Sequence, residues 1–126
     1  MMVFPIRRGF GTTTTNGVIT KNELKQRLGE VRIVDVTEPY ELEQTGEIDE
    51  TASNVPLQYI VDGALGMDDE TFLDTFGFDK PNVEEDCVFV CKAGVRSRLA
   101  QTIARDHFGY KYALNYLGGA DEWFSV

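Results

Sequence analysis

The stretch Val88-Phe89-Val90-Cys91-Lys92-Ala93-Gly94-Val95-Arg96-Ser97-Arg98 carries the clearest indication of the fold. Its apolar start is typical of a buried strand, and the loop after Cys91 has one glycine and three basic residues before a helical pattern over 99–108. A strand that leads through a short loop into a helix is the unit from which parallel sheets are built. Backbone N–H groups, the helix dipole and nearby cations favour a thiolate at such a point. The stretch therefore predicts a reactive cysteine in an α/β domain.

The flanking sequence continues the alternation of strands and helices. Strand patterns cover 32–36, 53–55, 87–90 and 111–116; helical patterns cover 20–29, 40–44, 57–65, 70–76, 99–108 and the segment after 119. The first helix has a capping box at Thr20 and Glu23. In the helix over 99–108, the buried face is expected to hold Leu99, Ala100 and Ile103. This alternation predicts an α/β domain with a mostly parallel sheet. Ligands of such folds bind beyond the carboxyl ends of the strands, where Asp35 and Cys91 stand.

The charge of the chain is uneven. It has 126 residues with 12 basic and 21 acidic side chains, a net charge of −9. This balance argues against binding to nucleic acids or anionic membranes, and no apolar run approaches the length of a membrane span. Residues 88–105 nevertheless hold four basic residues and no acid. A basic island in an acidic protein predicts a local anion site, although Arg98 and Arg105 could equally well solvate a helix face.

The two cysteines, Cys87 and Cys91, lie on the same expected strand. Four residues of strand separate their Cα atoms by roughly 13 Å, too far for a disulfide. With a single histidine in the chain, neither a structural zinc site nor another metal site is expected. This is the cysteine usage of an intracellular protein with one thiol available for chemistry.

The N-terminus is expected to be a flexible tail over 1–17, followed by one domain over 18–126. The first fifteen residues are rich in Arg and Thr and lack acids, as mitochondrial presequences do, but Pro5, Gly9 and Gly11 weaken the helix that such a signal needs. We therefore expect a cytoplasmic protein, with the mitochondrion as the alternative compartment.

The length of the loop indicates which anion it holds. Cysteine phosphatases and arsenate reductases have five residues between cysteine and arginine, whereas four separate Cys91 from Arg96. Gly94 permits a tightly curved backbone, so residues 92–96 can direct N–H groups at the sulfur. Arg96 can donate several hydrogen bonds to an anion docked there. The shorter loop is better matched to one extra sulfur atom than to a phosphoryl group.

Several segments together resemble the single-domain rhodanese-like proteins, over about residues 18–125. The matching segments are Asp35-Val36-Thr37-Glu38-Pro39-Tyr40-Glu41, Gly46-Glu47-Ile48 with Ala52-Ser53-Asn54-Val55-Pro56, the loop Cys91 to Arg96, Phe108-Gly109-Tyr110, and Asn115 with Gly118-Gly119 and Trp123. The chain is most similar to the small eukaryotic thiosulfate:glutathione-type sulfurtransferases. It departs from the family pattern at Thr37, Glu47 and Ala120, where the family often has Arg, His and an aromatic residue. None of these departures touches the loop.

The resemblance implies a three-layer domain with a central, mostly parallel five-stranded sheet flanked by helices. It also implies transfer of a sulfane sulfur from thiosulfate, or a similar small anionic donor, through a Cys91 persulfide to cyanide or to a thiol such as glutathione or thioredoxin. In this interpretation Cys91 is catalytic and the substrate is bound by Lys92, Ala93, Gly94, Val95 and Arg96. Asp35, Ser97 and Arg98 support the site. No cofactor or metal is expected, and we expect a monomer.

Two other functions stay open. One is a non-catalytic rhodanese-like module that binds a partner, although such modules often lack the cysteine. The other is a cysteine phosphatase or arsenate reductase, which the four-residue spacing disfavours. The presence of both Cys91 and Arg96 favours catalysis.

Overall fold

The computed structural model of the chain describes residues 17–125, so the tail expected over 1–17 lies outside the described residues except for Gly17. The strands are β1 (Val18–Ile19), β2 (Arg32–Asp35), β3 (Ser53–Asn54), β4 (Cys87–Val90) and β5 (Ala113–Tyr116). The helices are α1 (Lys21–Gln26), α2 (Pro39–Thr45), α3 (Leu57–Val61), α4 (Asp69–Phe76), α5 (Val95–Phe108) and α6 (Gly119–Trp123), with a 3-10 turn, η1 (Ala64–Gly66), between α3 and α4.

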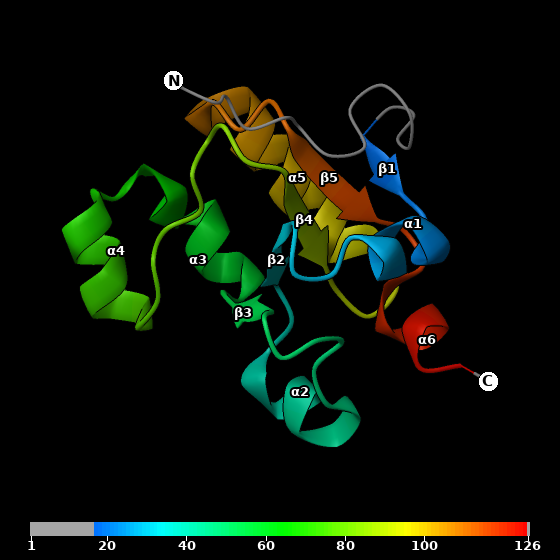
Figure 1. The fold of residues 1–126 in the computed structure, drawn as a ribbon. Helices are drawn as coiled ribbons and strands as arrows, with labels where there is room; N and C mark the ends of the chain where they lie inside the picture. Colours follow the sequence, from blue (N-terminus) through cyan, green and yellow to red (C-terminus); the bar gives the residue numbers. More distant parts are fainter. Residues whose placement is uncertain (1–16, 126) are drawn as a thin grey trace.

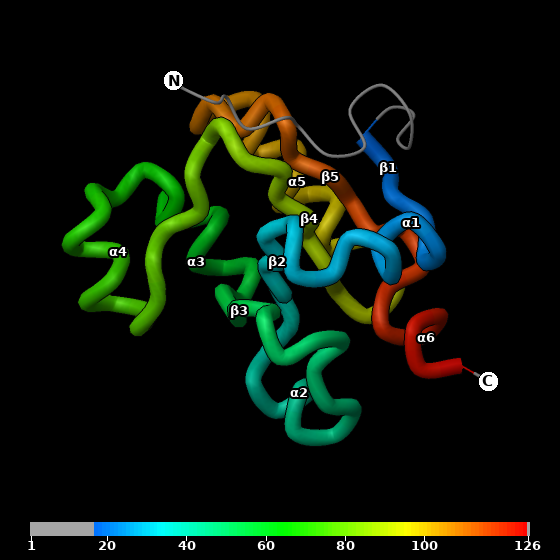
Figure 2. Tube along the Cα trace, viewed as in Figure 1, coloured from blue at the N-terminus to red at the C-terminus, as the bar shows by residue number. Residues whose placement is uncertain are grey.

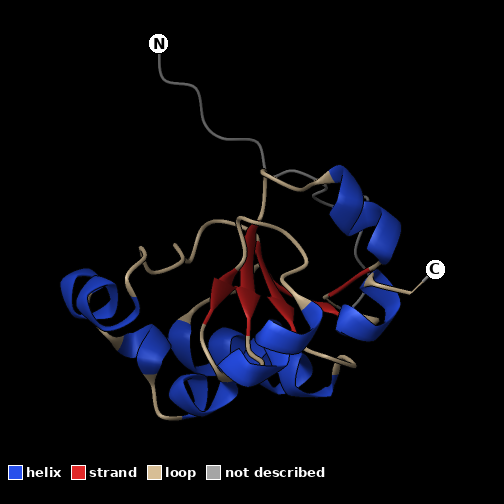
Figure 3. Ribbon diagram, turned by 90° about the horizontal axis from the view of Figure 1, so that it is seen from below, coloured by secondary structure: helices blue, strands red, loops and turns tan. Residues whose placement is uncertain are grey.

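The five strands form one sheet in the order β1-β5-β4-β2-β3, and every neighbouring pair is parallel. The strand arrows consequently run in the same direction (Figure 3). Strands β2 and β4 are adjacent, with Asp35 level with Val90, the residue before Cys91. The expected α/β domain with a parallel five-stranded sheet is confirmed. This arrangement brings Asp35 and Cys91 to one edge of the sheet.

Helices cover both faces of the sheet, which gives the three layers (Figure 1). Successive strand side chains point to opposite faces. Val34 and Phe89 pack with residues of α3, η1, α4 and α5 on one face. Ile33 and Val88 pack on the other face in a cluster that includes Leu24 of α1 and, at its margin, Trp123 of α6. Because β4 is buried on both faces, its sequence is apolar throughout.

Two expectations about the elements were wrong. Helix α5 begins at Val95 rather than Leu99, because Gly94 at φ +82° turns the chain directly into the helix. Leu99 is also not buried but 47% exposed, whereas Ala100 faces the core as expected, together with Ala104. The residues alone also gave no sign of β1, whose two residues are too few for a periodic pattern. The capping box of α1, in contrast, is present as expected.

Candidate active site

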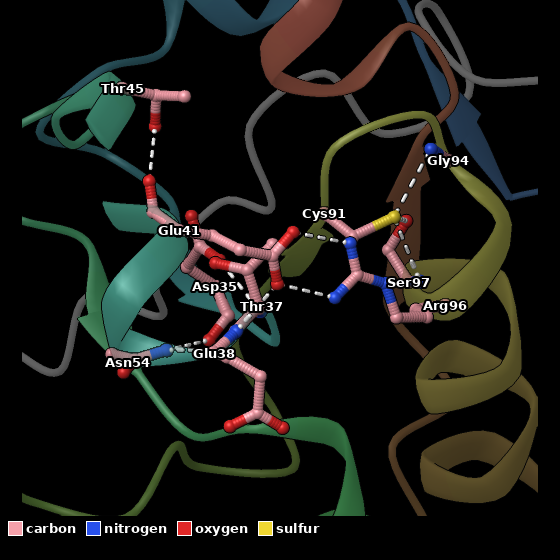
Figure 4. Close-up of polar contacts among 10 residues, drawn as sticks. All are labelled: Asp35, Thr37, Glu38, Glu41, Thr45, Asn54, Cys91, Gly94, Arg96 and Ser97. Carbon is pink, nitrogen blue, oxygen red and sulfur yellow. Dashed lines mark hydrogen bonds and ion pairs between the residues drawn. The ribbon is translucent and has the colours of Figure 1, made fainter. Parts of the chain in front are cut away.

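Three polar groups surround the sulfur of Cys91, which is only 1% exposed. The N–H groups of Gly94 and Ser97 donate to Sγ at 3.1 and 3.3 Å, and the Ser97 hydroxyl lies 3.2 Å from it (Figure 4). One of these backbone donors, Gly94, belongs to the loop 92–96. The other, Ser97, lies in the first turn of α5. N–H groups directed at one sulfur stabilise negative charge on it. The loop therefore has the form of a thiolate or persulfide cradle.

The loop is held in this shape by the turn between β5 and α6, which lies beside it (Figure 2). A Cβ atom on Gly94 would lie 2.1 Å from the Leu117 carbonyl oxygen, and one on Gly119 would lie 2.6 Å from the Cys91 carbonyl oxygen. The Ala120 N–H donates to that same Cys91 carbonyl at 2.9 Å. Both glycines also have positive φ angles, +82° and +65°. Glycine is therefore required at both positions for the two segments to approach each other.

Arg96 forms a bidentate ion pair with Glu41 of α2 (Figure 4). Its Nη1 and Nη2 donate to Oε1 and Oε2 at 2.7 and 2.9 Å, and the Glu38 N–H donates to the same carboxylate at 2.9 Å. The hydrogen bond from Arg96 is the main cause that lowers the pKa of Glu41 to about 2. Arg96 is thus fixed between α2 and the loop. Its remaining N–H donors are left for an anion.

Asp35 is the last residue of β2 and is hydrogen-bonded to the turn that follows it. Its carboxylate is buried and accepts hydrogen bonds from the N–H and the hydroxyl of Thr37. Burial raises the pKa of Asp35, and the bonds from Thr37 oppose this only in part. Asn54 of β3 donates to the carbonyl oxygens of both residues at 2.9 and 2.8 Å. This network fixes the start of α2 and so the position of Glu41.

The other expected binding residues lie at the surface of the loop. Lys92 is exposed and pairs with Asp121 of α6 at 2.6 Å, while Ala93 and Val95 are exposed beside it. Arg98 is exposed on α5. The structure thus brings Cys91, Gly94, Arg96 and Ser97 together, and leaves these four at the rim or beyond it.

Cys87 and Cys91 differ in their surroundings. Both are free thiols, as expected from their spacing in the sequence. Cys87 is completely buried in the core, and this burial raises the pKa of its thiol. Cys91, although also buried, lies where β4 opens into the loop and has polar donors around its sulfur. Cys91 is therefore the thiol suited to chemistry.

Sequence reasoning did not identify Glu41 or Asn115 as site residues. Both belong to segments that resemble family motifs, but nothing in their local sequence indicates a contact with the loop. The Ser97 hydroxyl donates to Asn115 Oδ1 at 2.6 Å, and Asn115 Nδ2 donates to the Gly94 carbonyl at 3.2 Å. Asn115 thus contacts both the loop and the first turn of α5.

Among the described residues, pockets lie between α2 and α6, and the smaller of them reaches Lys92 of the loop. The first, of about 50 Å³, is lined by Asp35, Thr37, Glu41, Leu42, Gln44, Thr45, Lys92 and Ala120. The second, of about 230 Å³, is lined by Thr45, Ala120, Asp121, Phe124 and Ser125. Because the two share Thr45 and Ala120, they adjoin each other between α2 and α6.

Within residues 17–125, no group of three or more His, Cys, Asp or Glu could hold a metal ion. No helix in that same range is long and apolar enough to cross a bilayer.

Comparisons with known proteins point to one family. The family model described as "Rhodanese-like domain" matches residues 20–125. A Saccharomyces cerevisiae protein named thiosulfate sulfurtransferase RDL2, mitochondrial, is 34% identical over 74% of this chain and 60% of its own length. A human thiosulfate:glutathione sulfurtransferase is 36% identical over 57% of this chain and 62% of its own. The chain thus spans about three fifths of the length of each. The solved structure of the human single-domain sulfurtransferase TSTD1 superposes with a TM-score of 0.78 at 31% identity, covering 86% of this chain and 96% of that one.

Proposed function

The chain belongs to the rhodanese-like domain family, and from this premise we propose that it is a thiosulfate sulfurtransferase that acts through Cys91. The observation that carries the proposal is the buried sulfur with two backbone N–H donors at 3.1 and 3.3 Å. A sulfur that alternates between thiolate and persulfide needs donors that stabilise negative charge in both forms. The names of the matched relatives support the same activity.

The proposed first half-reaction uses the Cys91 thiolate as the nucleophile. It attacks the outer sulfur of thiosulfate, the sulfur–sulfur bond of the donor breaks, and sulfite leaves with the electron pair. The N–H groups of Gly94 and Ser97 stabilise the anionic sulfur, and Arg96 and Lys92 offset the charge of donor and sulfite. Lys92 suits this task because its side chain is exposed and its pairing with Asp121 is weak.

In the second half-reaction an acceptor thiolate attacks the outer sulfur of the persulfide, and the Cys91 thiolate leaves. We propose glutathione as the acceptor, because a matched human relative carries that acceptor in its name. The open pocket of about 230 Å³ between α2 and α6 supports this choice, since it adjoins Lys92 through the smaller pocket. A thioredoxin-like dithiol and cyanide are the alternative acceptors.

The compartment, assembly and domain limits are proposals as well. The name of the matched Saccharomyces cerevisiae relative places that protein in mitochondria, which favours the mitochondrial alternative over the cytoplasm here. We also propose that the chain is a monomer and that its domain begins near residue 18.

The test is a steady-state assay with thiosulfate as donor and cyanide, glutathione or thioredoxin as acceptor. We expect turnover in the wild type, the highest kcat/KM with glutathione, and a loss of at least about 1,000-fold in Cys91→Ser, the scale for removal of a nucleophile. Hydrolysis of a phosphate ester is the matched control reaction. Phosphate-ester hydrolysis without sulfur transfer would favour the phosphatase alternative. Neither reaction, in a folded protein, would favour the binding module.

A further inference from the structure

The side chains around Cys91 form a closed chain of hydrogen bonds. Cys91, Ser97 and Asn115 are each at most 1% exposed. The Gly94 carbonyl can only accept, so the amide group that faces it at 3.2 Å is Nδ2 of Asn115. Oδ1 of the same amide then faces the Ser97 hydroxyl at 2.6 Å. Because Oδ1 can only accept, the Ser97 proton is directed at Asn115.

This direction decides which atom donates between Cys91 and Ser97. The hydroxyl has one proton, and Asn115 receives it. Across the 3.2 Å between Sγ and Oγ, the donor is therefore the Cys91 thiol, and Ser97 accepts. When the thiol loses its proton to solvent, Oγ presents lone pairs to a thiolate. The Ser97 hydroxyl then either rotates so that its proton points at the sulfur, or the repulsion between its lone pairs and the thiolate persists.

We propose that Asn115 is a positioning residue that competes with the Cys91 thiolate for the Ser97 hydroxyl. Rotation of the hydroxyl toward sulfur leaves Oδ1 of Asn115 without a donor in a buried site, which is costly. Asn115 therefore opposes formation of the thiolate, and Ser97 favours it. A further consequence rests on the proposed sulfur transfer. In that reaction the competition favours the persulfide over the thiolate, because the charge of the persulfide lies on its outer sulfur and the Ser97 hydroxyl can return to Asn115.

Other charged groups lie around the loop. They are Arg96 and Lys92 on the loop and α5, Asp35 and Glu41 from β2 and α2, and Asp121 from α6. None of them is altered in the variants below. Differences between these variants consequently report on the hydroxyl and the amide.

The test is the pH dependence of alkylation of Cys91 by iodoacetamide, followed by the mass of the peptide that contains it. We expect the midpoint to fall by about one pH unit in Asn115→Ala, because the hydroxyl is freed for the thiolate. In Ser97→Ala the midpoint should rise, since the thiolate loses a donor, and Ser97→Thr should restore it. The double variant Ser97→Ala with Asn115→Ala should have the same midpoint as Ser97→Ala alone, because Asn115 acts only through the Ser97 hydroxyl.

Gln101→Ala is the matched control. Gln101 is a buried amide on α5 that donates to the carbonyl of Ala113 on β5, but it does not contact the sulfur. A purely structural role of Asn115 predicts the same shift in both amide variants, and that result would overturn the proposal. An unchanged midpoint in a folded Asn115→Ala would do so too. If Asn115→Ala does not fold, an unchanged or lower midpoint in Ser97→Ala contradicts the proposal. Alkylation needs no sulfur donor, so these outcomes are independent of the sulfurtransferase assay.

Discussion

The ion pair between Arg96 and Glu41 connects two segments that are 55 residues apart in the sequence. The pKa of Glu41 lies at about 2 in the folded protein against an ordinary 4.5. A carboxylate with a lowered pKa contributes stability above its unfolded pKa, and this contribution is lost as the pH falls through the folded value. The window in which the pair loses its effect is therefore about pH 4.5 to about pH 2.

Replacement of Glu41 should show this window in equilibrium unfolding. We expect Glu41→Gln to be less stable than the wild type near pH 6, and the difference between them to shrink toward about pH 2. The measurement is the urea midpoint over that pH range. Glu43→Gln, an exposed position on the same helix, is the control and should show no such convergence. A constant difference for Glu41→Gln would mean that the pair does not stabilise the fold.

Residues of the site could be predicted from the sequence only where they are contiguous. Cys91, Gly94 and Arg96 stand in one loop, so their spacing alone indicates a cradle for an anionic sulfur. Glu41 and Asn115 come from α2 and β5, and only the sheet order brings them to the loop. Arg96 was expected to bind an anion, but its ion pair with Glu41 was not foreseen, because the sequence does not show which acid faces an arginine.

At the scale of elements, the approach of α6 to the loop depends on glycine. We expect Gly94→Ala to destabilise the fold by about 3 kcal/mol, since it adds left-handed strain and a Cβ that overlaps the Leu117 carbonyl. Gly77→Ala is the matched control, because Gly77 has a φ of +84° and its added Cβ would have no atom of a more distant residue within 4 Å. It should cost only about 1 kcal/mol, the strain alone. Equal losses in urea unfolding would mean that the close approach is not required.

The elements themselves could be predicted where periodicity and caps agree. The capping box of α1 and the apolar run of β4 are both present as expected. The start of α5 could not be predicted, because its first turn holds one valine followed by three polar residues and so shows no apolar period. Leu99 fits a buried helical pattern, but the rotation of α5 on the sheet, which the sequence does not show, places it 47% exposed.

At the scale of the whole molecule, two apolar clusters share one sheet. Phe89 is fully buried in the cluster that includes α3, α4 and α5, whereas the single tryptophan, Trp123, lies against the other cluster. If the domain unfolds as one unit, Phe89→Ala should lower stability by about 3–5 kcal/mol and shift tryptophan fluorescence and far-UV circular dichroism together.

Leu99→Ala is the control for this change, and its effect should stay below about 1 kcal/mol because Leu99 is half-exposed. Separate transitions for the two probes in Phe89→Ala would show that the two faces of the sheet unfold independently.

The fold class could be predicted at this scale because the alternation of strands and helices extends along the whole domain. The fifth strand, β1, followed only from the family resemblance, since its two residues carry no pattern.

The central claim, that Cys91 carries the transferred sulfur, is tested most directly by the intact mass of the protein after incubation with thiosulfate. We predict a gain of one sulfur atom in the wild type and in Cys87→Ala, its removal by cyanide, and no gain in Cys91→Ser. A wild-type protein that gains no sulfur from thiosulfate, or a Cys91→Ser protein that gains one, would contradict the account.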